Sequence, residues 1–316
     1  MPPTPILSVL TSAYRSEAYL PHFFEQIQAQ SIFAQLELVL VLNEVSPQER
    51  KLAQNFADKL AGRVQLIEVS PVETLGASWN RAWRVARAPF LTLWNVDDRR
   101  RPDSLEWQVA ALEAHPDWIA CYGDYLAVDE HGQESGKRRH TPHYAPSAFR
   151  RAFPQGGAFW VYRKTLAEQL GYFDEQFHVG PDFDLSIRIA AGGYQMGRVD
   201  GLLGYFTNAQ RGLSTRDGAA RSAVERTAIQ LRYGVFDKVR SDLVEEGRGY
   251  HLGQILSFGA WHPIETYLPA YRSYIQRRLW LKWVGRLRNA TRRLFRKLGI
   301  LDWLYGLQDR YLKREI

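Results

Sequence analysis

Residues 90–98 read FLTLWNVDD, a short apolar run that is followed at once by two adjacent carboxylates. A run of this length and composition is typical of a buried strand. Three further runs of the same kind precede it, at residues 6–11, 36–42 and 64–69, and stretches with helical features separate the four. Strands that alternate with helices predict an α/β fold in which a mostly parallel sheet is flanked by helices.

The sequence also indicates where helices and loops begin. Ser46-Pro47-Gln48-Glu49 has the form of a capping box with proline at the first helical position. A helix is expected to start near Pro21, and residues 79–88 are expected to form another. Residues 129–154 are polar and rich in His, Pro and Gly, which predicts a long loop. After Asp217 nearly all of the chain is expected to be helical.

The adjacent carboxylates Asp97 and Asp98 are the most informative pair in the sequence. In an open α/β sheet, ligands bind outside the carboxyl ends of the strands, which is where this pair is expected. Two neighbouring carboxylates repel each other unless a cation or ligand balances them, and carboxylates combined with substrate phosphates suit Mg²⁺ or Mn²⁺. The alternative is a solvated turn that caps the helix near Asp103, and the pair alone leaves both interpretations open.

Composition and charge limit the class of protein. The chain has 316 residues, 45% of them hydrophobic and 24% charged, which allows one large domain and a smaller appendage. Cys121 is the only cysteine, so no internal disulfide forms, as is typical of a reducing compartment. The N-terminus does not have the form of a signal peptide, and no apolar run reaches the roughly 20 residues of a spanning helix. We therefore expect a cytoplasmic protein or one that lies on the cytoplasmic face of a membrane.

The positive charge of the chain is concentrated at its end. From Arg272 onward there are 13 Lys and Arg against 3 Asp and Glu, a local balance of +10 within a total of +7. Apolar residues fall on one helical face of this segment: Trp280, Val284, Leu287, Leu294 and Leu298, with Trp283 and Phe295 beside them. Residues 219–316 are therefore expected to form a helical region that associates with an anionic membrane surface. The alternative is a helix packed on the main domain. Nucleic acid is an unlikely partner, because no motif that binds it accompanies the charge.

Four short motifs follow one another along most of the chain. They are the strand and turn at 6–14, GASWN at 76–80, NVDD at 95–98, and GYFDE at 171–175 followed by GPDFDL at 180–185 and Arg188. Together they resemble glycosyltransferase family 2, the inverting enzymes with the GT-A fold. The resemblance implies a GT-A-like (Rossmann-like) catalytic domain over residues 1–218. Such a domain moves a sugar from a nucleotide-sugar donor to a hydroxyl of a lipid-linked or cell-surface glycan acceptor.

The resemblance also implies roles for particular residues. Asp182 would be the general base, and Asp97 and Asp98 would hold Mg²⁺ or Mn²⁺. The donor would be bound by Thr11, Ala13, Tyr14, Asn43, Glu44, Gly76, Asn80, Asn95, Val96 and Asp97. The acceptor would meet Gly156, Gly157 and Asp184. A structural alternative is that Asp182 and Asp184 stabilise the N-terminus of a helix, and Asp184 is placed to pair with Arg188 one turn on.

The chain departs from the family pattern at several positions. Asn95 stands where the family has its first Asp, Asn43 where it has an Asp that reads the nucleobase, and Pro181 where it has a Glu. No His occurs between residues 205 and 214, where the family often supplies one to the metal.

These departures favour an alternative function, a non-catalytic nucleotide-sugar-binding protein attached to a membrane, whereas the retained Asp97 and Asp182 favour an enzyme. A dinucleotide-dependent oxidoreductase is disfavoured, because the turn at residues 12–15 has no glycine. Three arginines, Arg99 to Arg101, are nearby cations for a diphosphate, and we expect at least two of them to be solvated instead.

Overall fold

The computed structural model describes residues 4–60, 62–151, 158–208, 220–298 and 300. The chain divides into two compact units, and the division falls between Leu268 and Pro269. The helices that follow the predicted domain boundary at residue 218 therefore begin inside the first unit. The boundary itself lies outside the described residues, and the domain assignment stays a prediction.

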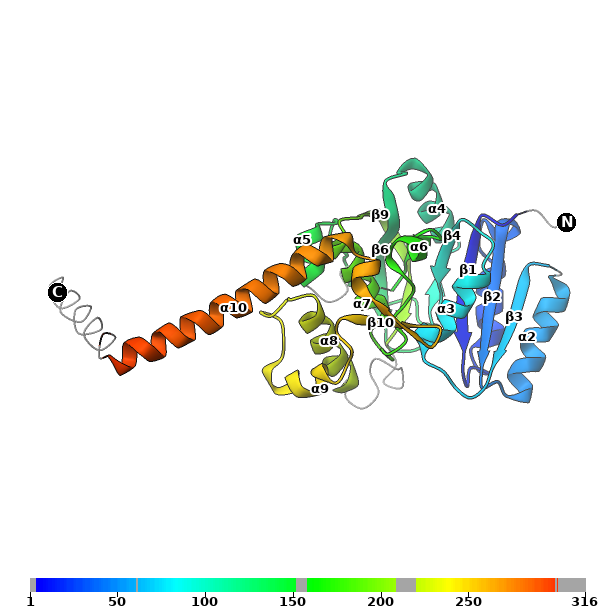
Figure 1. Ribbon diagram of the computed structural model, residues 1–316. Helices are drawn as coiled ribbons and strands as arrows, with labels where there is room; N and C mark the ends of the chain where they lie inside the picture. The colour runs from blue at the N-terminus through cyan, green and yellow to red at the C-terminus, as the bar shows by residue number, and fades with distance from the viewer. Residues whose placement is uncertain (1–3, 61, 152–157, 209–219, 299, 301–316) are drawn as a thin grey trace. The chain divides into compact units, whose positions relative to one another are not determined.

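The first half of the sheet is parallel and follows from the apolar runs of the sequence. Strand β1 (Leu7–Ala13) lies between β2 (Leu36–Asn43) and β4 (Phe90–Leu93), and β3 (Val64–Val69) lies outside β2. All eight residues of β2 are buried, as expected for a strand that is covered on both faces. Figure 1 shows these strands side by side at the blue end of the chain.

The second half of the sheet mixes directions. The short strand β8 (Val161–Arg163) runs antiparallel to both β4 and β6 (Trp118–Val128). Strand β9 (Gln195–Thr207) pairs parallel with β6, and β5 (Arg99–Arg100) and β7 (Lys137–Arg139) add short antiparallel partners. The described residues thus form one sheet in the order β3-β2-β1-β4-β8-β6-β9-β5, with β7 beside β6. The predicted α/β class with a mostly parallel sheet is confirmed.

Local capping determines where the helices of the first half begin. Helix α1 spans Leu20–Gln28, α2 Pro47–Lys59, α3 Leu75–Val85 and α4 Ser104–Ala114. The capping box of Ser46 and Glu49 is present, as predicted. Helix α3 begins four residues before the predicted start, because the Thr74 hydroxyl accepts the N–H of Ala77 and caps the helix there.

The second half contains more structure than the sequence indicated. The predicted loop at 129–154 includes β7 and helix α5 (Pro146–Arg151). Helices α6 (Leu166–Leu170), α7 (Pro181–Ala191), α8 (Ala220–Arg232) and α9 (Val244–Arg248) follow. The expectation of helix alone after Asp217 is wrong, because β10 (Gln254–Ser257) and β11 (Ala260–Pro263) form a hairpin. Both residues of its turn, Phe258 and Gly259, have positive φ values of 51° and 71°, which suits a tight two-residue connection.

The prediction that at least two of Arg99 to Arg101 are solvated is also wrong. Arg99 is 8% exposed and Arg100 only 2%. The Arg100 guanidinium donates to Gln108 Oε1 at 2.9 Å and to Thr92 Oγ1 at 2.7 Å, and burial lowers its pKa to about 9. The two residues are drawn inward because they form β5, which pairs with Tyr205 and Gly204 of β9.

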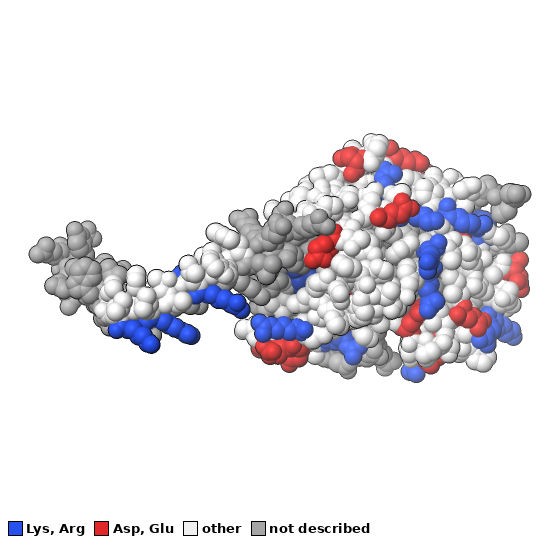
Figure 2. Space-filling model, in the orientation of Figure 1, with Lys and Arg blue, Asp and Glu red and all other residues white. Residues whose placement is uncertain are grey.

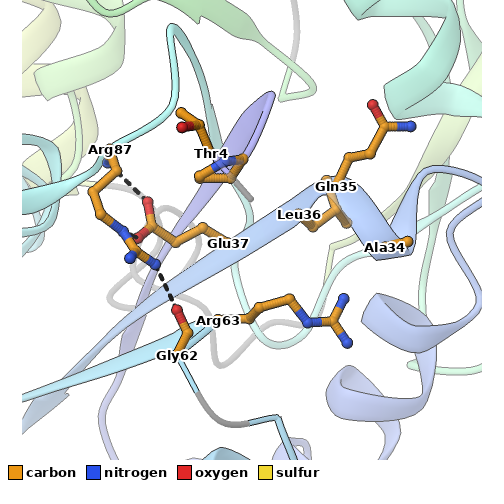
Figure 3. Close-up of a pocket in the computed structure, with 9 residues that line it drawn as sticks. Thr4, Ala34, Gln35, Leu36, Glu37, Gly62, Arg63 and Arg87 are labelled. Atoms are coloured by element: carbon orange, nitrogen blue, oxygen red, sulfur yellow. Dashed lines mark hydrogen bonds and ion pairs between the residues drawn. The ribbon is translucent and has the colours of Figure 1, made fainter. Parts of the chain in front are cut away.

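A small pocket lies at the amino ends of the strands and is too small for a substrate. It measures about 40 Å³, comparable to the volume of one water molecule. Residues before β1 and at the start of β2 line it, and Figure 3 shows the buried Glu37 carboxylate there with the guanidinium of Arg87. Because ligands of such sheets bind at the opposite, carboxyl ends, this pocket has a structural role.

The second unit contains the long helix α10 (Pro269–Lys297). Its described apolar side chains are exposed: Trp280, Trp283, Val284, Leu287, Leu294 and Phe295, and also Leu298 just beyond it. Figure 2 shows Lys and Arg along one edge of the described part of this helix, with uncharged atoms beside them. Among the described residues, no helix combines the length and the apolar character that crossing a bilayer requires.

Candidate active site

The carboxyl ends of three parallel strands bring the predicted donor residues to one edge of the sheet. Strand β1 ends at Ala13, β2 at Asn43 and β4 at Leu93, and Tyr14, Glu44 and the 95–98 segment follow them. Since the three strands are parallel neighbours, these followers lie along the same edge, where such sheets bind ligands.

Asp98 faces inward and its oxygens are engaged. The residue is 4% exposed; its Oδ1 accepts the N–H of Thr207 at 3.0 Å, and Oδ2 accepts from the Asn95 amide at 3.4 Å. Burial, together with the neighbouring charge of Asp97, raises the pKa of Asp98 well above its ordinary value. Asp98 therefore ties the turn to β9, and of the two predicted metal ligands Asp97 is the one with an available carboxylate.

Asp97 is held by its backbone, which leaves its side chain for a ligand. Its carbonyl oxygen accepts from Thr207 Oγ1 at 2.5 Å and lies 3.1 Å from Nδ1 of His131. The carboxylate is half-buried, its own backbone N–H is the one hydrogen-bond donor that acts on it among the described residues, and burial raises its pKa. Neither His131 nor Thr207 was predicted from the sequence.

These residues fit a divalent cation that arrives with a diphosphate, and do not fit a cage built from protein alone. The described residues contain no group of three or more His, Cys, Asp or Glu side chains placed to hold a metal. Mg²⁺ in nucleotide sites commonly takes one or two carboxylates and completes its shell with phosphate and water oxygens. Asp97 supplies the carboxylate that this arrangement needs.

Asp182 lies in the first turn of α7 and is partly exposed. Its Oδ1 accepts the N–H of Phe183 at 2.8 Å, and its own backbone N–H also acts on the carboxylate. Burial raises its pKa to about 6. A carboxyl group with this pKa is ionised near neutral pH and still basic enough to accept a proton.

Tyr125 of β6 links the two acidic segments. Burial raises the pKa of its phenol, and the charges of Asp98 and Asp182 raise it further. Both charges therefore act on the same phenol, although 84 residues separate the two aspartates in the sequence. The start of α7 also lies against the start of α3, because a Cβ atom added at Gly76 would lie 3.4 Å from Pro181 Cβ.

Asp184, by contrast, belongs to a buried charge cluster. Its carboxylate is fully buried and pairs with Arg188 one turn on, as predicted, and with Arg232 of α8 at 2.7 Å. Tyr233 donates to the same carboxylate at 3.0 Å, and Arg232 also pairs with Asp174 at 2.8 Å.

Burial acts to raise the pKa of Asp184, but the two arginines outweigh it and hold the pKa below its ordinary value. This geometry favours the structural interpretation of Asp184 over a contact with an acceptor.

Two of the predicted donor-binding amides bind backbone. The Asn43 side chain donates to the carbonyl of Glu73 and accepts its N–H, both at 3.0 Å. Asn80 does the same with Phe173, at 2.9 Å each, and also donates to Glu175. Each amide therefore holds a loop in place beside the site.

The remaining donor candidates differ in exposure. Thr11 is buried and its hydroxyl donates to the carbonyl of Trp94, and Ala13, Gly76 and Val96 are also buried. Tyr14 is 39% exposed. Glu44 is exposed at a hollow of about 230 Å³, which Arg50, Glu68 and Ser70 also line. The predicted acceptor glycines Gly156 and Gly157 lie outside the described residues.

Comparison with known proteins gives related sequences over much of the chain. A family model described as "Glycosyltransferase like family 2" matches residues 2–221. An uncharacterized glycosyltransferase of Haemophilus influenzae is 25% identical over 232 residues, which cover 72% of this chain and 85% of that one. The amylovoran biosynthesis glycosyltransferase AmsE of Erwinia amylovora is 25% identical over 205 residues, 63% and 74% of the two chains. The uncharacterized protein y4gI of Sinorhizobium fredii is 27% identical over 190 residues, but the match spans only 20% of that protein.

Solved structures of low sequence identity share the fold. Staphylococcus aureus TarS 1-349 in complex with UDP-GlcNAc has a TM-score of 0.58 at 15% identity, over 76% of this chain and 69% of that one. The mannosyltransferase PcManGT of Pyrobaculum calidifontis, in complex with GDP-Man and Mn²⁺, has a TM-score of 0.54 at 16% identity, over 86% and 74%. The predicted GT-A-like fold is thereby confirmed.

The raised pKa of Asp182 predicts a cost in stability. The folded chain holds this pKa at about 6 against an ordinary value of 3.8, so the folded state binds the proton more tightly than the unfolded state. The contribution of Asp182 to the free energy of unfolding is then largest below about pH 4 and falls by up to roughly 3 kcal/mol as the pH rises to about 6.

We expect Asp182→Asn, which keeps an acceptor for Phe183 but carries no charge, to raise the free energy of unfolding by about 1–3 kcal/mol near neutral pH. Near pH 4 the substitution should have little effect. Urea unfolding at the two pH values measures both numbers, and equal stability of variant and parent chain at neutral pH would contradict the assignment.

Proposed function

Because this chain belongs to the glycosyltransferase-like family 2, we propose that it is an inverting enzyme that transfers a sugar from a nucleoside diphosphate sugar to an acceptor hydroxyl. The observation that carries the mechanism is the partly exposed carboxylate of Asp182, which belongs to the first turn of a helix that lies against Gly76 at the start of α3, and whose pKa burial raises to about 6. The departures from the family pattern are the one argument for the non-catalytic alternative, and the comparisons with known proteins do not support it.

The proposed reaction is a single displacement at the anomeric carbon. The acceptor oxygen attacks that carbon while its proton passes to the free carboxylate oxygen of Asp182. The bond between the anomeric carbon and the phosphate oxygen breaks, and the nucleoside diphosphate leaves with the electron pair. One displacement from the opposite face inverts the configuration of that carbon.

The leaving diphosphate gathers negative charge that has to be compensated. Arg99 and Arg100 are buried in the fold, so we assign this role to a cation held by Asp97. When bound, Mg²⁺ or Mn²⁺ neutralises charge on the departing phosphate. Thr207 and His131 fix the peptide of Asp97 and so orient its carboxylate. Tyr14 and Glu44, at the ends of β1 and β2, are placed to meet the nucleoside.

The first test concerns the base. Asp182→Asn should lower kcat for nucleoside diphosphate release by roughly 10²-fold or more, with UDP-GlcNAc and GDP-mannose as trial donors. In the parent chain the rate should fall about tenfold per unit below pH 6, because the protonated carboxyl accepts no proton.

Asp200→Asn is the matched control, because Asp200 is exposed and its carboxylate bonds to Arg198 outside the site. It should leave the rate within about twofold. Turnover by Asp182→Asn at the rate of this control would remove Asp182 from the role.

A second test concerns the cation. Thermal shifts with UDP or GDP report nucleotide binding, since a ligand that binds the folded state raises the melting temperature. In the parent chain Mn²⁺ should increase the shift, and in Asp97→Ala the shift should be the same with and without Mn²⁺. Asp103→Ala, which loses a carboxylate paired with Arg101, should behave as the parent chain. Equal nucleotide binding and turnover by the parent chain in excess chelator would contradict a role for the cation.

We further propose that the acceptor is a lipid-linked or cell-surface glycan and that α10 holds the enzyme on the anionic, cytoplasmic face of a membrane. Support comes from the described side chains of α10. Trp280, Val284, Leu287, Leu294 and Leu298 recur at helical spacing and fall within a stripe about 80° wide. All are exposed, and Arg286, Arg288, Arg293 and Lys297 lie outside this stripe. Aliphatic and aromatic residues facing one way and cations the other suit the interface of an anionic bilayer.

Two charge-matched variants separate the apolar and the electrostatic parts of this binding. One is the double variant Leu287→Glu/Leu294→Glu, and the other is the double variant Arg286→Gln/Arg293→Gln. Each changes the net charge of the chain by −2. The arginine pair should weaken binding to phosphatidylglycerol vesicles at low salt, by about 1 kcal/mol per cation, and keep a salt-resistant fraction. The leucine pair should lose that fraction as well.

Cosedimentation with phosphatidylglycerol and phosphatidylcholine vesicles at two salt concentrations measures both effects. Equal partition of the parent chain and the leucine variant would eliminate the proposed contact. A leucine variant that unfolds in the absence of vesicles would instead support a helix packed on the rest of the protein.

A further inference from the structure

The turn in front of α7 is held by a side chain from another helix. Helix α7 begins after Gly180, which has no side chain with which to cap it. The carboxylate of Glu225, on α8, accepts the backbone N–H groups of His178 at 2.9 Å, Val179 at 2.8 Å and Gly180 at 2.9 Å. Three consecutive N–H groups thus converge on one carboxylate, just before Asp182.

This arrangement is buried and closely packed. Glu225 is fully buried. A Cβ atom added at Gly180 would lie 3.1 Å from Ile229 Cδ1 and 3.6 Å from the Glu225 carboxylate, so the turn lies directly against α8. Charged acceptors make stronger hydrogen bonds than neutral ones, and a negative charge is favourable beside the N-terminus of a helix. The Glu225 carboxylate therefore holds the turn that leads into α7, and its negative charge lies beside the N-terminus of that helix.

We propose that Glu225 is a positioning residue of the active site, whose carboxylate fixes the 178–180 turn and thereby the place and the electrostatic surroundings of Asp182. The inference rests on the proposed role of Asp182 as the base. Glu225 lies beyond residues 2–221, which the family model matches. The proposal thus assigns part of the active site to α8.

Other polar groups face Glu225 and are expected to keep their contacts. The Tyr250 hydroxyl lies 3.4 Å from its Oε1, and Nδ1 of His178 lies 3.8 Å from the same oxygen. The positive charge of Arg221 acts to lower the pKa of both His178 and Tyr250. The negative charge of Glu225 repels that of Asp182 and so acts to raise the pKa of Asp182. Removing the charge of Glu225 should therefore make Asp182 easier to ionise.

The test compares Glu225→Gln, Glu225→Asp and a matched control, Thr227→Val, in the full chain. Thr227 is buried two residues further along α8, and its hydroxyl donates to Ala223 within that helix. The control thus removes a buried hydrogen bond from α8 without touching the 178–180 turn. Release of UDP or GDP from UDP-GlcNAc or GDP-mannose gives kcat, KM and the pH profile, and ¹³C NMR of labelled Asp, assigned with Asp182→Asn, gives the titration of Asp182 directly.

We expect Glu225→Gln to lower kcat about tenfold or more with KM for the donor changed less than about twofold, because one amide oxygen replaces two charged acceptors. The midpoint of the Asp182 titration should move down by about half a pH unit or more. Glu225→Asp keeps the charge, so it should restore the midpoint and part of kcat. Thr227→Val should leave both unchanged.

The inference would be overturned if Glu225→Gln and Thr227→Val had the same kcat and the same midpoint of the Asp182 titration. The proposed function fails separately, by normal turnover of Asp182→Asn. The NMR titration distinguishes the two failures, because it reports how Glu225 acts on Asp182 whether or not Asp182 is the base.

Discussion

The second half of the molecule depends on the buried guanidinium of Arg232. It joins Asp174, which follows α6, to Asp184 of α7. It also donates to three carbonyl groups at and just before the start of the hairpin, those of His251, Leu252 and Gln254. Burying several charges is costly unless each has its partners, and removing one partner from such a group typically costs 3–5 kcal/mol. The cluster therefore forms as a whole, and it determines how α7, α8 and the β10–β11 hairpin pack together. The start of α7, with Asp182, takes its position from that packing.

The local pattern of the sequence was sufficient to predict the parallel half of the fold. Each of its strands consists mostly of apolar residues, and the capping box that begins α2 joins Ser46 to Glu49, its near neighbour in the chain. The pairing of Asp184 with Arg188 was predictable for the same reason, since the two lie one turn apart. The errors fall where distant segments decide. Arg100 appeared to be a solvated residue because nothing near it in the sequence shows that β5 would pair with β9.

The motifs of the candidate site contain residues whose side chains are exposed at the edge of the sheet and residues whose side chains hold the backbone of neighbouring loops. The side chains that are at least partly exposed are those of Asp97, Asp182, Tyr14 and Glu44. The amide groups of Asn43 and Asn80 instead form hydrogen bonds with the backbone of Glu73 and Phe173. A motif identifies both kinds alike, because a residue that holds a loop is as necessary as one that binds substrate. His131, Thr207 and Glu225 carry no motif, and only the folded chain shows that they hold the peptides of Asp97 and of the turn before Asp182.

The position of Glu225 and Arg232 along the chain has a consequence during synthesis. Strands β1 to β4 are complete by residue 93, and β1 pairs in parallel with both β2 and β4. Glu225, which holds the turn in front of α7, and Arg232, the counter-charge of Asp184, are synthesised later, after the whole of α7. A nascent chain therefore contains the first four strands well before it contains Glu225 and Arg232, so the turn in front of α7 and the charge of Asp184 gain their partners only once α8 has been synthesised.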